Sequence, residues 1–444
     1  MVKDMTKGNP TRLLLSFAIP MLIGNIFQQL YSMVDSIVIG QGVGVNALAA
    51  VGATFTLDWA VLGFGIGLGQ GFAILVAQKF GAEDYKGLKK AFTMSIYLTA
   101  IVAIIITIIS RSLTMPLLKI LNTPSELICD SNLYISIIFS GIIITMFYNF
   151  FSATLRALGD SRTPLVALVI ASSINVVLDI LFVMKFNMGI AGAAYATLIA
   201  QTSSCIFCLL AIRKVDFFAL EKKDWHVDKD FLGRLIILGL PMALQSSIIS
   251  IGAMVLQYVV NGYGALYVAA YTAAVKIVGI IEQPGSTFGF AMATYAGQNL
   301  GANKFERIQL GLRKCIKISM ISCLGIMAIV FLFGENFIAL IVSKEETEVI
   351  AIAKEYIHIS VSMLFILNLL FIYRSALQGF GNTVIPMISG ALELIARISL
   401  AMFLPKFLGF TGICVAEVSA WLSADILLIP SYYKNMHRLK NKYS

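Results

Sequence analysis

Residues 155–160 read LRALGD and are followed by Pro164, and residues 377–382 read LQGFGN and are followed by Pro386. The two stretches lie about half of the 444-residue chain apart. Each joins one long apolar run to the next through small residues that favour a turn. The chain therefore contains the same kind of unit twice.

Further pairs of segments keep the same separation. Residues 78–82 (QKFGA) return as 298–302 (QNLGA), residues 189–192 (GIAG) return as 409–412 (GFTG), and Pro20 returns as Pro241. Two similar bundles in one membrane chain are the usual construction of a secondary transporter, which places its substrate site between them.

The composition is that of a membrane protein. Hydrophobic residues make up 58% of the chain and charged residues only 13%, whereas soluble domains are about 45–50% apolar. The mean hydropathy is +0.86. The apolar runs are long enough for helical spans of about 20 residues and too continuous for the alternating strands of a membrane barrel. We therefore expect an all-α integral membrane protein.

The apolar runs predict twelve transmembrane helices, six in each half. Their expected ranges are 12–39, 47–77, 91–110, 127–153, 164–186, 189–212, 233–261, 268–297, 315–334, 348–373, 385–407 and 411–431. An even number per half gives both halves the same orientation, so the axis relating them runs along the membrane normal. The expected domains are an N-terminal six-helix lobe (1–212), a cytoplasmic linker (213–232), a C-terminal six-helix lobe (233–433) and a cytoplasmic tail (434–444).

Basic residues are sorted to one side of the predicted membrane. With the last three residues at each helix end included, the termini and the loops after even-numbered helices carry 25 Lys and Arg, whereas the loops after odd-numbered helices carry 5. Because basic loops stay in the cytoplasm, both termini are predicted to be cytoplasmic. The net charge of +9 reflects this sorting and does not indicate a nucleic-acid partner. A short amphipathic segment is expected in the linker, around residues 217–220.

The first half carries polar residues at membrane depth. Asp35 lies deep in the first helix, where a carboxylate is costly unless it faces a polar interior or is neutralised. Asn175 and Asp179 are four residues apart and share one face of the fifth helix, and Thr197 follows one helix later. We call these four residues the acidic cluster. With an offset of one residue, the second half has Leu256, Arg397 and Ala401 in place of Asp35, Asn175 and Asp179.

The acidic cluster offers two carboxylates, an amide and a hydroxyl, which is an all-oxygen set of ligands. Hard cations such as Na⁺ prefer such a set, so Asp35, Asn175, Asp179 and Thr197 are the candidate metal ligands. The same residues are able to hold a proton, because two neighbouring buried carboxylates do not both ionise at low cost. Both ions stay open at this point, and no cofactor other than H⁺ or Na⁺ is predicted.

Other polar residues within the predicted helices are secondary candidates. Those considered for contact with substrate are Gln28, Tyr31, Met33, Asp58 and Glu282. Glu393 and Arg397 are four residues apart, which favours a structural ion pair. His358 is an isolated histidine, for which a structural role is more common than proton relay.

Several apparent motifs do not indicate sites. The glycines at 63, 65, 67, 69 and 71 lie within an apolar helix and follow no strand, so they favour close packing over phosphate binding. Cys205 and Cys208 have no second pair of ligands nearby in sequence, which argues against a metal site. The six cysteines lie mostly within helices, which argues against a disulfide framework. No HExxH-like spacing is present, and the chain is not expected to be an enzyme.

The chain resembles the multidrug and toxic compound extrusion (MATE) family over essentially its whole length. The resemblance rests on the twelve helices in two halves, on Val34–Asp35 in the first helix, on Gly-Ala after helices 2 and 8, and on the run at 155–160. It implies two lobes in a V-shaped arrangement around a central cavity. It also implies export of amphipathic, often cationic compounds, driven by inward H⁺ or Na⁺.

The chain looks most like the DinF-like prokaryotic branch, in which the coupling site lies in the first lobe. The acidic cluster matches that site in residue type and spacing, and Tyr134 matches the tyrosine of helix 4. Pro20 matches the proline at which helix 1 is proposed to bend. Other branches place acids in helices 7 and 10, but residues 235–261 contain no Asp or Glu and helix 10 has only Glu348 and Glu355 near its start. The first lobe is therefore expected to carry the coupling.

The function implied by the resemblance is a secondary active antiporter that exports an amphipathic, cationic drug or metabolite in exchange for H⁺ or Na⁺. A monomer in the bilayer of the bacterial cytoplasmic membrane is expected. The alternative in the same superfamily is a flippase for a lipid-linked oligosaccharide. Its pyrophosphate favours several Arg or Lys in the cavity, whereas the sequence places only Lys276, Lys354 and Arg397 at depth.

Overall fold

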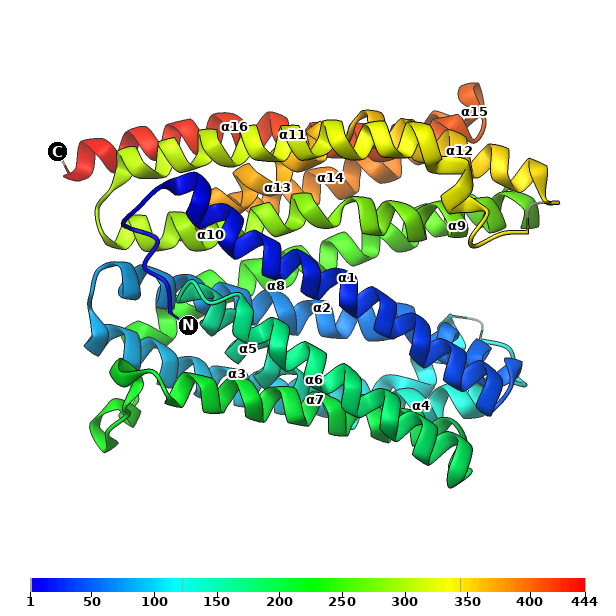
Figure 1. Ribbon diagram of the computed structural model, residues 1–444, viewed down its shortest axis with the longest axis horizontal. Helices are drawn as coiled ribbons and strands as arrows, with labels where there is room; N and C mark the ends of the chain where they lie inside the picture. The colour runs from blue at the N-terminus through cyan, green and yellow to red at the C-terminus, as the bar shows by residue number, and fades with distance from the viewer. Residues whose placement is uncertain (1, 122, 344, 444) are drawn as a thin grey trace. The chain divides into compact units, whose positions relative to one another are not determined.

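The computed structural model describes residues 2–121, 123–343 and 345–443, and the regular structure in these ranges is helical (Figure 1). This part of the chain contains ten helices long and apolar enough to cross a membrane. Two further pairs of helices, each bent at a short break, meet the same criterion together. Counting each bent pair as one span gives twelve, which confirms the predicted number.

The chain forms two compact units. Unit 1 comprises Met1–Asp4 and Ile19–Ser247, and unit 2 comprises Met5–Ala18 and Ile248–Ser444. The divisions fall within α1 (Pro10–Gly42) and α8 (Lys229–Asn261). Each unit thus holds most of one sequence repeat.

Five spans belong wholly to unit 1. They are α2 (Val45–Gly81), α3 (Tyr85–Ile120), the pair α4 (Ile128–Ser140) and α5 (Ile142–Ala157), α6 (Arg162–Asp179) with the π-helical turn Ile180–Lys185, and α7 (Gly189–Arg213). The α4–α5 pair bends by 50°. The bend lies at Gly141, where a Cβ atom would stand 2.1 Å from Leu198 Cδ2. Glycine at this bend therefore leaves room for the Leu198 side chain of α7, which a Cβ atom would displace.

Unit 2 repeats this order. It contains α9 (Ala265–Ile281) continuing into α10 (Gln283–Gly301), α11 (Phe305–Ile338), the pair α12 (Thr347–Ser362) and α13 (Leu364–Gly379), α14 (Val384–Phe403) with α15 (Pro405–Leu408), and α16 (Thr411–Tyr443). The α12–α13 pair bends by 49°, nearly the same angle as α4–α5. The bend is thus a property of the repeat.

Unusual backbone conformations also recur in equivalent places. Positive φ angles pair as Gly159 (80°) with Gly381 (81°), Gly189 (60°) with Gly409 (59°), and Glu83 (56°) with Asn303 (57°). At Gly159 a Cβ atom would stand 2.2 Å from Lys3 O, so glycine is needed there for space as well as for conformation. The turns that join the spans therefore follow the same path in both units.

The glycines of α2 serve helix packing, as the sequence indicated. A Cβ atom on Gly71 would lie 2.5 Å from Gly239 Cα, and one on Gly67 would lie 2.5 Å from Met242 O. On Gly69 it would lie 3.3 Å from Phe150 Cα. Small residues let α2 approach the backbones of α8 and α5 this closely.

Gly71→Ala is therefore expected to destabilise the protein by about 1–3 kcal/mol, because the new methyl group meets backbone that has no rotamer to change. Gly52→Ala is the matched control: Gly52 is exposed on the same helix with no atom within 4 Å of its Cβ position. The melting temperature of the purified protein in detergent checks this. Equal melting temperatures for Gly71→Ala and the native protein would contradict the packing account.

The segment between the halves is docked on α3. Its two 3-10 turns are Asp216–Phe218 and Lys222–Trp225. Thr93 Oγ1 donates to Asp224 O (2.8 Å), and Phe218 packs its ring on Phe92 with centroids 4.9 Å apart. The amphipathic segment expected near residues 217–220 is thus a 3-10 turn followed by extended chain.

Asp84 caps α3 in the loop that follows α2. Its Oδ1 accepts from Gly87 N (2.8 Å) and its Oδ2 accepts from Lys79 Nζ (2.7 Å). The Lys79 bond foremost, and the Gly87 bond next, hold the pKa of the Asp84 carboxyl below its usual range. A lowered pKa in the folded state means that the stabilisation is full above the unfolded-state pKa and is lost as the pH falls through the folded-state pKa.

Asp84→Asn is expected to lower stability at neutral pH by about 0.5–1 kcal/mol, because the pair is partly exposed and screened. The difference from the native protein should shrink as the pH falls below about 4 and vanish near the lowered pKa. Melting temperatures measured in detergent at a series of pH values check this. Lys79→Gln removes the other partner and should give the same pH profile; a deficit that stays constant in acid would refute the electrostatic origin.

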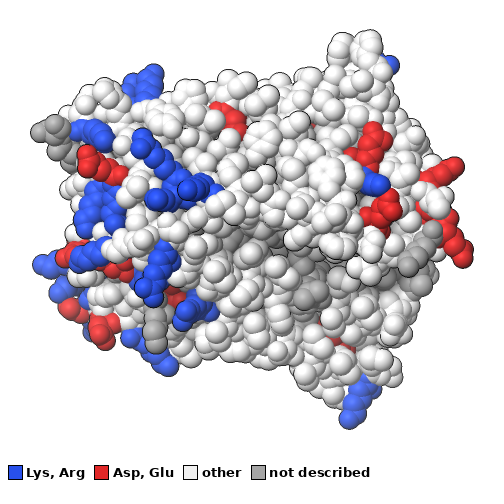
Figure 2. All heavy atoms as spheres, turned by 45° about the horizontal axis from the view of Figure 1, so that its top comes forward, with Lys and Arg blue, Asp and Glu red and all other residues white. Residues whose placement is uncertain are grey.

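Lys and Arg (blue) gather over the helix ends at which the predicted cytoplasmic loops lie, on the face drawn in Figure 2. Most of the remaining surface on that face is uncharged, as expected of helices that contact lipid.

Candidate functional site

Three helices of unit 1 bring the acidic cluster together. Asp35 comes from α1, Asn175 and Asp179 from the last two turns of α6, and Thr197 from α7. Asp179 is the last residue of α6 and directly precedes the π-helical turn Ile180–Lys185. Such turns occur often at functional sites, where they redirect a side chain.

Asn175 is the centre of the hydrogen-bond network. With its amide oriented so that both ends are satisfied, Nδ2 donates to Asp179 Oδ2 (2.8 Å) and to Tyr31 Oη (2.8 Å). Its Oδ1 accepts from Thr197 N (3.1 Å). The amide nitrogen, and not the amide oxygen, therefore faces the carboxyl group of Asp179.

Asp35 and Asp179 are hydrogen-bonded to each other through their carboxyl groups. Because an ionised carboxylate is only an acceptor, this bond requires a proton on one of the two. Asp35 Oδ1 and Asp179 Oδ1 are buried and have no hydrogen-bond partner within the described ranges. The pair thus keeps open acceptor oxygens, as expected of a site that binds a proton or another cation.

The side chains of the acidic cluster are buried to different degrees. Asn175 and Asp179 are fully buried, whereas Asp35 and Thr197 are half-buried. Tyr134 of α4 lies within electrostatic range of Asp35 and Asp179. All five residues expected to couple the ion therefore lie together, and their role in coupling stays a prediction.

Unit 1 contains two neighbouring cavities, and the first of them adjoins the acidic cluster at Thr197. One of about 170 Å³ is lined by Gln28 and Tyr31 together with Thr197. The other, about 190 Å³, is lined by Pro20 and again by Gln28. Met33 lies outside both linings, and 62% of its surface is exposed.

Glu282 and Asp58 belong to different units of the chain. Glu282 belongs to unit 2, between α9 and α10, where its electrostatic neighbours are Glu417, Arg397 and Glu393. Asp58 of α2 lies in unit 1, half-buried, and Tyr134 is within its electrostatic range. A contact with substrate stays a prediction for both.

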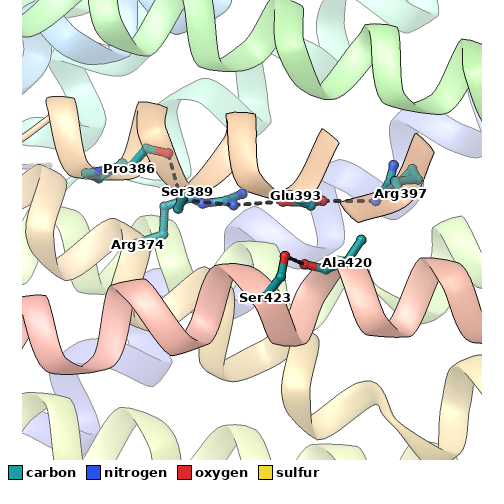
Figure 3. Close-up of polar contacts among 7 residues, drawn as sticks. All are labelled: Arg374, Pro386, Ser389, Glu393, Arg397, Ala420 and Ser423. Atoms are coloured by element: carbon teal, nitrogen blue, oxygen red, sulfur yellow. Dashed lines mark hydrogen bonds and ion pairs between the residues drawn. The ribbon is translucent and has the colours of Figure 1, made fainter. Parts of the chain in front are cut away.

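Unit 2 contains a buried ion network where unit 1 has its acidic cluster. Glu393 Oε2 accepts from Arg374 Nη2 (2.9 Å), and Glu393 Oε1 accepts from Arg397 Nη2 (2.9 Å). Each of the three side chains is less than 10% exposed. Figure 3 shows the carboxylate between the two guanidinium groups, and Ser389 beside Arg374. The ion pair expected between Glu393 and Arg397 is therefore present.

Arg374 was missed by the sequence interpretation, which ended the tenth helix at residue 373 and assigned Arg374 to a loop. The helix α13 runs on to Gly379 and buries Arg374. Lys354, which the sequence placed at depth, pairs with Glu335 (2.5 Å), and these side chains are 40% and 61% exposed. A charged residue ends an apolar run in the sequence but does not end the helix when a buried counter-ion is available.

Besides the acidic cluster, the chain has cysteines and other side chains of the kinds that bind metal ions other than Na⁺. Among the described residues, no group of three or more His, Cys, Asp or Glu is arranged to hold a metal ion. All six cysteines are free thiols. The acidic cluster, with two acids, an amide and a hydroxyl, thus matches a proton or an alkali cation better than a transition metal.

Comparison with known proteins gives consistent matches. A family model described as MatE matches residues 20–181 and 241–403. The chain is 32% identical over 357 residues to "Probable multidrug resistance protein YpnP" of Bacillus subtilis (strain 168), covering 80% of this chain and 79% of that protein. It is 26% identical over 428 residues to "Probable multidrug resistance protein NorM" of Thermotoga maritima, covering 93% and 89%.

Solved structures match over nearly the whole chain as well. The structure described as an outward-facing conformation of a multidrug resistance MATE family transporter of the MOP superfamily gives a TM-score of 0.91 at 25% identity, covering 98% of both chains. The two ranges matched by the family model correspond to the two repeats seen in the sequence and in the fold.

Proposed function

Because the chain belongs to the MatE family of multidrug efflux transporters, we propose that it is a secondary antiporter that exports amphipathic cationic compounds in exchange for protons. The acidic cluster is the observation that carries this proposal. It places two carboxyl groups, joined by a hydrogen bond, inside a membrane bundle. Ionisable groups at such depth mark ion pathways in transporters.

The proton is favoured over Na⁺ when the Asn175 amide takes the orientation that satisfies both of its ends. A sodium site would use the amide oxygen as a ligand, but this oxygen accepts from Thr197 N while the nitrogen points at Asp179 and Tyr31. Binding Na⁺ among these residues requires the amide to turn over and to give up these bonds. A second proton on the Asp35–Asp179 pair leaves the network in place.

The exchange follows from the charge of the pair. With one proton, the Asp35–Asp179 pair carries a single negative charge, which attracts a cationic substrate. A second proton, taken up on the outer side, removes that charge and releases the substrate. Loss of the proton on the inner side restores the charge. The coupling is reciprocal, so the factor by which a proton weakens substrate binding equals the factor by which substrate weakens proton binding.

No comparable feature supports the alternative function, a flippase for an anionic lipid-linked oligosaccharide. The two buried arginines of unit 2, Arg374 and Arg397, are both bonded to Glu393. Both guanidinium groups are therefore engaged with one carboxylate inside the protein, whereas pyrophosphate recognition requires donors directed at the ligand.

Transport in proteoliposomes tests the proposal. A pH gradient and a Na⁺ gradient are imposed separately on vesicles that contain the purified protein, and the movement of ethidium is followed by fluorescence. Export driven by the pH gradient alone supports proton antiport. Export driven only by the Na⁺ gradient refutes the choice of ion. If neither gradient drives ethidium transport and a fluorescent lipid pyrophosphate is transported instead, the antiport proposal is refuted.

A further inference from the structure

A row of polar side chains runs along one face of α5. Thr145, Asn149, Ser152 and Arg156 are spaced by four, three and four residues, so they share one stripe of the helix. At 1.5 Å per residue the row is about 16 Å long. Thr145 Oγ1 donates to Gln201 Oε1 of α7, and Asn149 Nδ2 donates to Thr145 O (2.9 Å). Polar groups inside an apolar bundle are costly, so a row of this length indicates a role beyond packing.

The two cavities of unit 1 lie along this row. The first, about 170 Å³, touches the acidic cluster at Thr197 and extends to Asn149. The second, about 190 Å³, begins at Asn149 and extends to Arg156 and to Ser161, the residue before α6. Each has room for several water molecules. Because Asn149 borders both, the cavities are neighbours and lead from the acidic cluster toward the end of unit 1 that carries the basic loops.

We propose that the coupling proton leaves the acidic cluster through these two cavities, within unit 1, and reaches the cytoplasm past Arg156. This rests on the proposed function as a proton antiporter. A proton moves along hydrogen-bonded water and hydroxyl groups and needs no opening as wide as an organic substrate does. The proton and the substrate therefore have separate ways to the cytoplasm, although they compete for the same negative charge.

Arg156 is the gate of this path. Its Nη1 donates to Ser152 Oγ (2.5 Å), and its side chain lines the second cavity. A fixed positive charge raises the energy of any cation beside it. Arg156 therefore slows the passage of protons when no substrate is transported, and it opposes the passage of Na⁺ more strongly because Na⁺ must move as a whole ion.

Filling the first cavity tests the path. Ser172 lines this cavity, is 4% exposed, and has an Oγ without a hydrogen-bond partner in the described part of the chain. Ser172→Leu is expected to lower proton-driven ethidium export about tenfold or more while ethidium still binds. Ser173→Leu is the matched control, because Ser173 is exposed, lines neither cavity and donates to Val169 O (2.9 Å). Native export rates in Ser172→Leu would overturn the path.

Cysteine labelling tests the path without any transport. In a background with Cys129 and Cys205 replaced by serine, the four remaining cysteines are buried. Asn149→Cys should react with a membrane-impermeant thiol reagent small enough to enter cavities of about 170 and 190 Å³, in inside-out vesicles and not in right-side-out vesicles. Thr154→Cys is the control on the same helix, since Thr154 is buried and lines neither cavity. Labelling of Asn149→Cys from the outer side only, from neither side, or no faster than Thr154→Cys would each overturn the proposal.

A proton-leak assay tests the role of Arg156. Vesicles containing Arg156→Gln and a pH-sensitive dye, with a pH gradient and no substrate, should acidify several-fold faster than vesicles with the native protein, whereas Arg156→Lys should stay close to native. An unchanged proton leak in Arg156→Gln would remove Arg156 from the path. Because the leak and the labelling are measured without substrate, they can support the path even where ethidium export fails, so the two proposals fail separately.

Discussion

Asp179→Asn is expected to abolish export driven by a pH gradient, lowering the rate about a hundredfold or to the level of empty vesicles. The amide has nearly the shape of the carboxyl group and still bonds to its neighbours, but it neither gains nor loses a proton. The negative charge that holds a cationic substrate is also gone. Asp35→Asn should have the same effect, because either substitution breaks the proton-sharing pair. Ethidium export from proteoliposomes under an imposed pH gradient is the measurement.

Asp130→Asn is the control for these variants. Asp130 is another acid of unit 1, in the first turn of α4, but its side chain is exposed and it belongs neither to the acidic cluster nor to the candidate substrate contacts. It should retain most of the native export rate. Unimpaired export in both Asp35→Asn and Asp179→Asn would refute coupling through unit 1, and equal losses in all three variants would show that the effect is not specific to the pair.

Glu393→Gln is expected to destabilise the protein by about 3–5 kcal/mol, because it leaves two buried guanidinium groups without their counter-ion. Arg374 and Arg397 each have a further nitrogen, Nε, without a partner in the described ranges, so the loss of Glu393 adds to donors that are already unsatisfied. The fraction of protein that stays monodisperse after heating in detergent reports the loss. A melting temperature equal to that of the native protein would show that the arginines find other acceptors.

Replacing all three residues of the ion network separates the effect of charge on stability from the effect of packing. The triple variant Arg374→Met, Glu393→Leu, Arg397→Met removes all three charges at similar volume, and such replacements are often neutral or stabilising. We expect it to recover most of the stability lost in Glu393→Gln and to retain proton-driven export. Recovery of stability with loss of export would instead give the network a part in transport.

The number and order of spans could be predicted because each requires about 20 apolar residues, a pattern that hydropathy records directly. The bends between α4 and α5 and between α12 and α13 could not be. They depend on contacts such as that of Gly141 with Leu198, two residues far apart in sequence. Gly141 is the only glycine in the apolar run from 127 to 153, but a single glycine does not by itself show that a helix breaks.

The acidic cluster was recognisable because i,i+4 spacing places Asn175 and Asp179 on one face and because carboxylates at depth are rare. The direction of the Asn175 amide could not be recognised from the sequence. It depends on Thr197 N and Tyr31, whose placement follows from the packing of α1, α6 and α7. Arg374 was missed for the opposite reason: its counter-ion Glu393 lies on another helix, and single-helix spacing does not reveal such a pair.

The proton shared by Asp35 and Asp179 has a consequence for energetics. If the pair gains one proton per cycle, the uptake of that proton in exchange for a monovalent cation moves no net charge across the membrane. Exchange is then electroneutral, the membrane voltage does no work on it, and each pH unit supports only about a tenfold concentration ratio. For a neutral substrate the exchange moves one positive charge inward, so the membrane voltage adds to the driving force. For a divalent cation it moves one positive charge outward, so the voltage opposes export. The charge of the compound, more than its affinity, would then determine how far it is expelled.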